Sequence, residues 1–117
     1  MLTVDARRLG DIGIVTAAGE VDAHSARILR DALVAAITDG TIRLVADLSE
    51  VTFLDSSGLG VLVGKLKDVR VRGGELHVVA VHDRVVRVFA ITGLDRVFAL
   101  HDSLDSALTD LGSPGQV

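Results

Sequence analysis

The spacing of apolar residues changes several times along the chain, and each change predicts a new element. Residues 2–9 and 12–18 are predicted strands, and the short connection through Gly10 and Asp11 indicates a hairpin. Residues 42–48 are almost continuously apolar, which is typical of a strand buried on both faces. Two shorter strands are predicted at 76–81 and 97–100.

Apolar positions at helical spacing predict about four helices between these strands. In the first, Ser25 is the expected N-cap and Gly40 the expected stop. In the second, Leu59, Leu62 and Leu66 form one apolar stripe, and the pair Gly73-Gly74 ends it. The remaining two helices are predicted between Asp83 and Gly93 and over residues 103–111.

A hairpin followed by alternating helices and strands predicts an α/β fold with a mixed sheet. We expect about four to five strands, covered by about four helices. The chain has 117 residues, of which 49% are hydrophobic, so it can bury one core. We therefore expect one domain over residues 1–111, and a disordered tail over residues 112–117.

Composition excludes several classes of function. The chain has no cysteine, which excludes disulfides and thiolate metal sites, and its net charge of −4 disfavours nucleic acid as a partner. We expect a cytoplasmic protein without a membrane partner, because the start does not resemble a signal peptide and no apolar run approaches bilayer length. The three aromatic residues, Phe53, Phe89 and Phe98, lie among apolar neighbours and are predicted core residues.

Polar residues gather where two predicted strands lead into helices. Asp55, Ser56 and Ser57 lie at or just before the start of the second helix, where backbone N–H groups lack partners and negative charge is favoured. A hydroxyl there can cap the helix, attack an electrophile or accept a phosphoryl group. Glu20 and Asp22 follow another strand, and the spacing leaves open whether the two loops adjoin.

Enzyme motifs do not fit this junction. The predicted strand ends too far before Gly58 and Gly60 for a dinucleotide-binding turn, and both glycines lie inside the helical pattern with Gly64. We attribute these glycines to close packing of the helix on the sheet. A phosphate loop would need Ser or Thr at Leu66, and neither serine has the flanking glycines of a nucleophile elbow.

The four histidines show no metal-ligand spacing, so we expect solvated or structural roles for them and predict neither a metal nor a cofactor. They are His24, His77, His82 and His101.

Residues 51–64, Val-Thr-Phe-Leu-Asp-Ser-Ser-Gly-Leu-Gly-Val-Leu-Val-Gly, closely resemble the signature of bacterial anti-sigma factor antagonists, the STAS-domain family. Two further segments match this family at the expected places: residues 19–22, Gly-Glu-Val-Asp, and residues 91–98, Ile-Thr-Gly-Leu-Asp-Arg-Val-Phe. The resemblance covers nearly the whole chain.

The resemblance implies a partner switch and no enzyme activity. The family's phosphorylated serine corresponds to Ser56, and the kinase is the anti-sigma factor itself, which uses ATP and magnesium. The unphosphorylated antagonist binds that kinase and frees the sigma factor, and a PP2C-type phosphatase resets the phosphorylated form. The positions implied in partner binding are Glu20, Asp22, Asp55, Ser57 and Gly58.

Two other hypotheses stay open at this stage. One is a STAS adaptor subunit in a stress-sensing or transport complex, and the other is a small enzyme or nucleotide-binding protein. The sequence identifies neither the sigma factor nor the signal, and it does not decide the oligomeric state.

Overall fold

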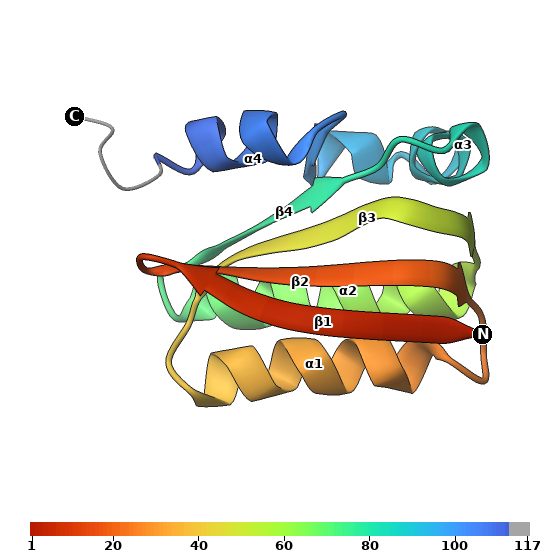
Figure 1. Cartoon of the computed structure of the whole chain (residues 1–117). Helices are drawn as coiled ribbons and strands as arrows, with labels where there is room; N and C mark the ends of the chain where they lie inside the picture. The colour runs from red at the N-terminus through yellow and green to blue at the C-terminus, as the bar shows by residue number, and fades with distance from the viewer. Residues whose placement is uncertain (113–117) are drawn as a thin grey trace.

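A computed structural model describes residues 1–112 of the chain (Figure 1). The strands are β1 (Leu2–Leu9), β2 (Ile12–Val21), β3 (Arg43–Leu54), β4 (Glu75–Val79) and β5 (Ala99–His101). The α-helices are α1 (Ala26–Thr38), α2 (Ser56–Val71), α3 (Asp83–Thr92) and α4 (Leu104–Asp110), and a 3₁₀ helix covers Leu94–Arg96. The last predicted segment, the disordered tail, falls mostly on residues 113–117, which lie outside the described part.

The five strands form one mixed sheet in the order β1-β2-β3-β4-β5. β1 and β2 are the predicted hairpin, with Leu9 opposite Ile12 and Gly10 at a φ of +63° in the turn. The pairs β2–β3, β3–β4 and β4–β5 are parallel. The prediction of an α/β fold with an N-terminal hairpin and a mixed sheet is therefore confirmed.

The helices cover the sheet from both sides (Figure 1). α1 and α2 lie along one face, where apolar side chains such as Leu29, Leu33 and Leu62 are fully buried. α4 lies on the opposite side, where Ala107 and Leu111 of the α4 region pack with Val45 and other strand residues in a smaller cluster. α3 follows β4 along the chain, and its Val85 and Phe89 are buried in the larger cluster. None of the helices in residues 1–112 is long and apolar enough to cross a bilayer.

Strand ends are where the structure departs most from the sequence. β2 continues to Val21 and β3 to Leu54, because the two strands stay paired beyond their predicted ends through two register shifts. The polar residues Glu50 and Thr52, which are exposed, interrupt the apolar pattern, so the sequence did not predict this extension. Distance from a strand end therefore gives no argument against a dinucleotide turn, although Gly58 and Gly60 do lie inside α2, as predicted. β4 and β5 are shifted by one or two residues.

Candidate functional site

The carboxyl ends of β2 and β3 lie side by side, at the right-hand edge of the sheet in Figure 1. Glu20 pairs with Phe53, and Val21 pairs with Leu54. Just beyond the strands, the backbone N–H of Asp55 donates to the carbonyl oxygen of Val21 over 3.2 Å. The two loops that carry the predicted site residues are therefore neighbours.

Asp55 is the N-cap of α2. Its backbone is extended, with φ −105° and ψ −171°. Its Oδ1 accepts hydrogen bonds from the backbone N–H of Ser57 at 2.9 Å and of Gly58 at 3.3 Å. These N–H groups have no partner inside the helix, and the helix dipole also favours a carboxylate at this end. Asp55 thus fixes the start of the helix, and with it the position of Ser56.

Ser56 is the first residue of α2, and its side chain is exposed, whereas Ser57 is half-buried. The next two backbone N–H groups already donate to Asp55. A group attached to the Ser56 hydroxyl would therefore extend toward solvent instead of folding back over the helix end. Of the two serines, Ser56 is the more accessible to a second protein.

Asp22 shapes the neighbouring loop. Its Oδ1 accepts hydrogen bonds from the backbone N–H of His24 at 2.9 Å, and from both the backbone N–H and the hydroxyl of Ser25 at 3.0 Å. These bonds, the Ser25 backbone bond most of all, hold the pKa of the Asp22 carboxyl below its ordinary value of 3.8. Asp22 is therefore an anion whose position is fixed close to α2.

The prediction that the Ser25 side chain caps α1 is wrong. Ser25 does occupy the N-cap position, but its side chain makes no cap hydrogen bond. Its hydroxyl instead shares its one hydrogen between the carbonyl oxygen of Glu20 at 2.9 Å and Oδ1 of Asp22 at 3.0 Å. Because Ser25 is 8% exposed, these bonds satisfy a buried hydroxyl and stabilise the loop itself.

Glu20 is exposed at the end of β2, and its Oε1 lies 2.9 Å from the amino nitrogen of Met1. The side chains are 53% and 92% exposed, so this ion pair contributes little stability. The structure thus places three carboxylates near Ser56: that of Glu20 at the end of β2, and those of Asp22 and Asp55 in the loops that follow β2 and β3. We call these four residues the switch site, after the role that the family resemblance implies for Ser56.

The three glycines of α2 differ in their surroundings. A Cβ atom at Gly58 would overlap the side chains of Leu54 and Val21, so its absence lets the helix start approach the sheet. Nothing lies within 4 Å of the corresponding positions at Gly60 and Gly64, and both residues are exposed. The prediction of close helix-to-sheet packing therefore holds for Gly58 and is wrong for Gly60 and Gly64.

Phe53 is the residue near the switch site that sequence analysis misjudged. Phe89 and Phe98 are buried and meet edge to face, as predicted core residues. Phe53 is 42% exposed at the end of β3, opposite Glu20. Apolar neighbours along the chain predicted burial, but Phe53 and the next residue, Leu54, point to opposite faces of β3, and the start of α2 covers only the side of Leu54. An exposed aromatic ring is a typical contact residue in protein interfaces.

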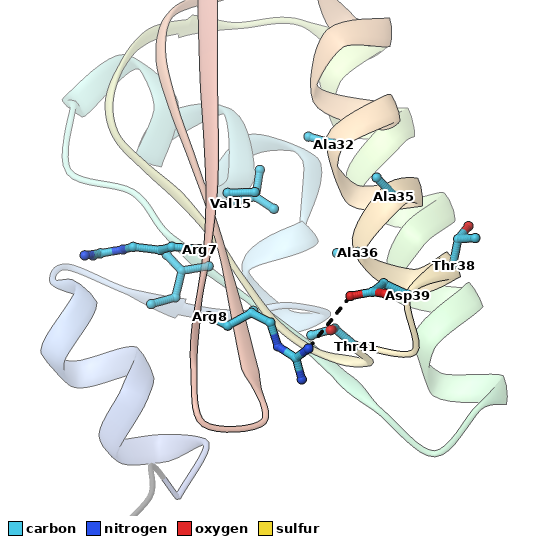
Figure 2. A pocket seen from close by; sticks show the side chains of 12 residues that line it. Arg7, Arg8, Val15, Ala32, Ala35, Ala36, Thr38, Asp39 and Thr41 are labelled. Atoms are coloured by element: carbon cyan, nitrogen blue, oxygen red, sulfur yellow. Dashed lines mark ion pairs between the residues drawn. The ribbon is translucent and has the colours of Figure 1, made fainter.

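A groove of about 670 Å³ separates the β1–β2 hairpin from α1 (Figure 2). Ala32, Ala35 and Ala36 of α1 line one wall, and Arg8 at the rim lies 3.8 Å from the carboxylate of Asp39. The lining residues come from the second half of β1, the start of β2, the second half of α1 and the turn after α1. The groove is therefore at the opposite end of the sheet from Ser56 and forms no part of the switch site.

Two of the four histidines meet in the fold, although their spacing in the sequence shows no pattern of metal ligands. His77 of β4 is buried, and its Nδ1 lies 3.1 Å from Nε2 of His101 in β5. Burial, and next the neighbouring His77, lower the pKa of His101 below its ordinary value of 6.5. The lowered pKa favours the neutral His101 ring, whose contacts are then hydrogen bonds.

Comparisons with known proteins agree with one another. The family model of the STAS domain matches residues 3–107. The anti-sigma-B factor antagonist of Listeria monocytogenes is 43% identical over 84 residues, covering 71% of this chain and 73% of that protein. The anti-sigma-B factor antagonist of Bacillus subtilis is 42% identical over 80 residues, covering 68% and 72%. The crystal structure of an anti-sigma factor antagonist from Mycobacterium paratuberculosis matches with a TM-score of 0.88 at 34% identity, covering 95% and 94%.

Proposed function

Because this chain belongs to the STAS-domain family of anti-sigma factor antagonists, we propose that phosphorylation of Ser56 switches its binding to an anti-sigma factor. The unphosphorylated chain binds an anti-sigma factor that is also a serine kinase, and this releases a sigma factor for transcription. The kinase transfers the γ-phosphoryl group of ATP to Ser56, and the complex dissociates. A PP2C-type phosphatase then restores the hydroxyl.

The main support for this proposal is the accessible Ser56 hydroxyl at the first position of α2, held there by the Asp55 cap. A kinase must bring the attacking oxygen in line with the γ-phosphorus, so the acceptor has to be exposed and its position well defined. Ser56 meets both conditions, whereas Ser57 is half-buried. The adjacent Asp22 carboxylate, fixed by its loop, is suited to contact the kinase near the acceptor.

Phosphorylation should leave the fold intact. A phosphoserine adds about −1.5 to −2 charges at pH 7, and the N-terminus of a helix favours negative charge. The Asp55 carboxylate keeps the nearest N–H groups occupied, so the phosphate faces outward. The modification therefore changes the surface and not the packing of α2.

The charge that phosphorylation adds to the contact surface explains why the complex with the anti-sigma factor dissociates. The phosphate joins the carboxylates of Glu20, Asp22 and Asp55, so a partner that fits the unmodified surface meets repulsion and an unpaired, desolvated charge. A thousandfold loss of affinity needs about 4 kcal/mol. We include Ser57, Gly58 and the exposed ring of Phe53 in the same contact surface.

The direct test is incubation with candidate anti-sigma kinases, ATP and magnesium, followed by phosphosite mapping and binding measurements. We expect phosphate on wild type and on the matched control Ser57→Ala, but none on Ser56→Ala. Ser56→Ala should bind the kinase whether or not ATP is present. Ser56→Asp should bind more weakly, with a melting temperature close to that of wild type.

Phosphate found only on Ser57 would contradict the assignment of the acceptor. Unfolding of Ser56→Asp would contradict the surface mechanism. Co-purification from cells gives a further check: a small partner with a kinase fold supports the switch, whereas a large oligomer or a transporter would support the adaptor hypothesis.

A further inference from the structure

A second polar cluster lies away from the switch site, between the far edge of the sheet and α4. It consists of His77 from β4, His101 from β5 and Asp110 from the last turn of α4. His77 Nδ1 and His101 Nε2 are 3.1 Å apart, and each lies 3.5 Å from Oδ2 of Asp110. Three groups from three elements thus bring one ligand atom each within 3.5 Å of the other two.

We propose that His77, His101 and Asp110 bind one divalent transition-metal ion, with Zn²⁺ as the best fit. The three ligand atoms form a triangle, and its centre lies about 2.0 Å from each of them. This distance is close to the usual Zn–N and Zn–O bond lengths. In a tetrahedral site with such bonds, ligand atoms are about 3.4 Å apart. The observed separations of 3.1, 3.5 and 3.5 Å are therefore close to one face of a zinc tetrahedron.

Neighbouring groups are compatible with the ring tautomers that metal binding needs. His77 Nε2 lies 3.0 Å from Oε1 of Glu75, which can only accept when ionised, so this nitrogen holds the proton and Nδ1 presents a lone pair. A carboxylate behind a histidine is the usual support for a metal ligand. His101 Nδ1 lies 2.8 Å from the hydroxyl of Ser106, which can accept a proton from the ring as readily as donate one.

This second contact allows two states of the cluster. Without metal, Nε2 of His101 donates its proton to Nδ1 of His77, and the Ser106 hydroxyl donates to Nδ1 of His101. With metal, the proton moves to Nδ1 of His101 and Ser106 accepts it, which leaves both facing nitrogens as ligands. No net proton is released if the tautomer simply changes, so the exchange needs no further reactant.

The donor set also indicates the type of metal. Two imidazole nitrogens and one carboxylate oxygen suit Zn²⁺ and its neighbours, whereas Mg²⁺ and Ca²⁺ prefer oxygen ligands alone. The side chains of His77 and His101 are 6% and 9% exposed, and that of Asp110 is 58% exposed. The ion would therefore enter from the Asp110 side, and water would fill a fourth position there.

Metal binding here would attach α4 to the two last strands of the sheet. The cluster is on the α4 side of the sheet and Ser56 begins α2 on the other side, so this inference does not rest on the phosphorylation switch. An ion that binds the folded chain and not the unfolded chain raises the melting temperature further as the ion concentration increases.

The test is titration of the metal-free full chain with ZnCl₂ by calorimetry, and with CoCl₂ by the visible absorption of tetrahedral Co²⁺. We expect one ion per chain and a rise in melting temperature. NMR should show Zn²⁺ shifting the imidazole signals of His77 and His101, while the exposed His24 and His82 serve as internal controls.

Asp110→Ala should weaken binding by about tenfold or more. Because Asp110 is exposed, this variant should remain folded, and Asp105→Ala removes an exposed carboxylate from the first turn of the same helix as a matched control. Absence of saturable binding at one ion per chain, equal affinity of Asp110→Ala and wild type, or shifts confined to His24 and His82 would overturn the proposal.

Discussion

Replacing the glycines of α2 by alanine, one at a time, should change stability in opposite directions although the chemical change is the same. At Gly58 a new Cβ would overlap the side chain of Leu54 and lie 2.7 Å from Cγ1 of Val21. Both neighbours are almost fully buried, at 2% and 0% exposure, so neither can move aside easily. At Gly60 and Gly64 the new methyl group would meet nothing within 4 Å.

The magnitudes follow from two opposing terms. Alanine favours a helix interior over glycine by up to about 1 kcal/mol, and overpacking a core contact destabilises by about 1–3 kcal/mol. Gly58→Ala should therefore lose about 1 kcal/mol or more of unfolding free energy. Gly60→Ala and Gly64→Ala should each gain about 0.5–1 kcal/mol. For a domain of this size, 1 kcal/mol corresponds to about 4 °C in melting temperature.

Urea unfolding, followed by circular dichroism on wild type and the three variants, measures these changes directly. Calorimetry of the same proteins gives the shifts in melting temperature. If Gly58→Ala were as stable as Gly60→Ala, the helix start would not be in close contact with β2 and β3. If all three substitutions destabilised equally, exposure of Gly60 and Gly64 would be the wrong explanation for their tolerance.

Three further outcomes are expected at or beside the switch site. Asp55→Ala should lose about 1–2 kcal/mol in urea unfolding, and Asp55→Asn should lose less because it keeps an acceptor for the two N–H groups; equal losses would contradict capping. The lowered pKa of Asp22 stabilises the fold above pH 3.8, and this contribution is lost as the pH falls through the folded-state pKa. The urea midpoints of wild type and Asp22→Asn should therefore differ at pH 7 and converge in acid, and a constant difference would refute the linkage. Phe53→Ser should weaken binding to the anti-sigma factor by about tenfold in calorimetry while changing unfolding by less than about 0.5 kcal/mol, whereas a large loss of stability would show that the ring acts in the core.

Local features of the switch site were predictable because they depend on residues close together in the chain. The change from a strand pattern to a helix pattern places Asp55, Ser56 and Ser57 at the start of α2. The capping bonds of Asp55 span two and three residues. A preference that is satisfied within one turn of helix is visible in the sequence.

Strand ends and exposure were harder to predict because they depend on distant partners. β3 continues to Leu54 only because β2 continues beside it, and the bulges between the two strands break the alternation of apolar and polar positions. Phe53 is exposed although the next residue, Leu54, is buried, because the two side chains point to opposite faces of β3 and α2 covers only one of these faces there. Neither property has a signature within a few residues.

The sequence by itself determined the order of strands and helices, the mixed α/β fold and the position of Ser56 at a helix start, since periodicity and capping act over short stretches of chain. Tertiary structure decided that the Asp22 loop lies against the Asp55 junction, which of three similar glycines is in close contact, and that His77 meets His101. These features arise because parallel strands pair although whole helices separate them in the sequence. The spacing of residues along the chain therefore does not predict these contacts.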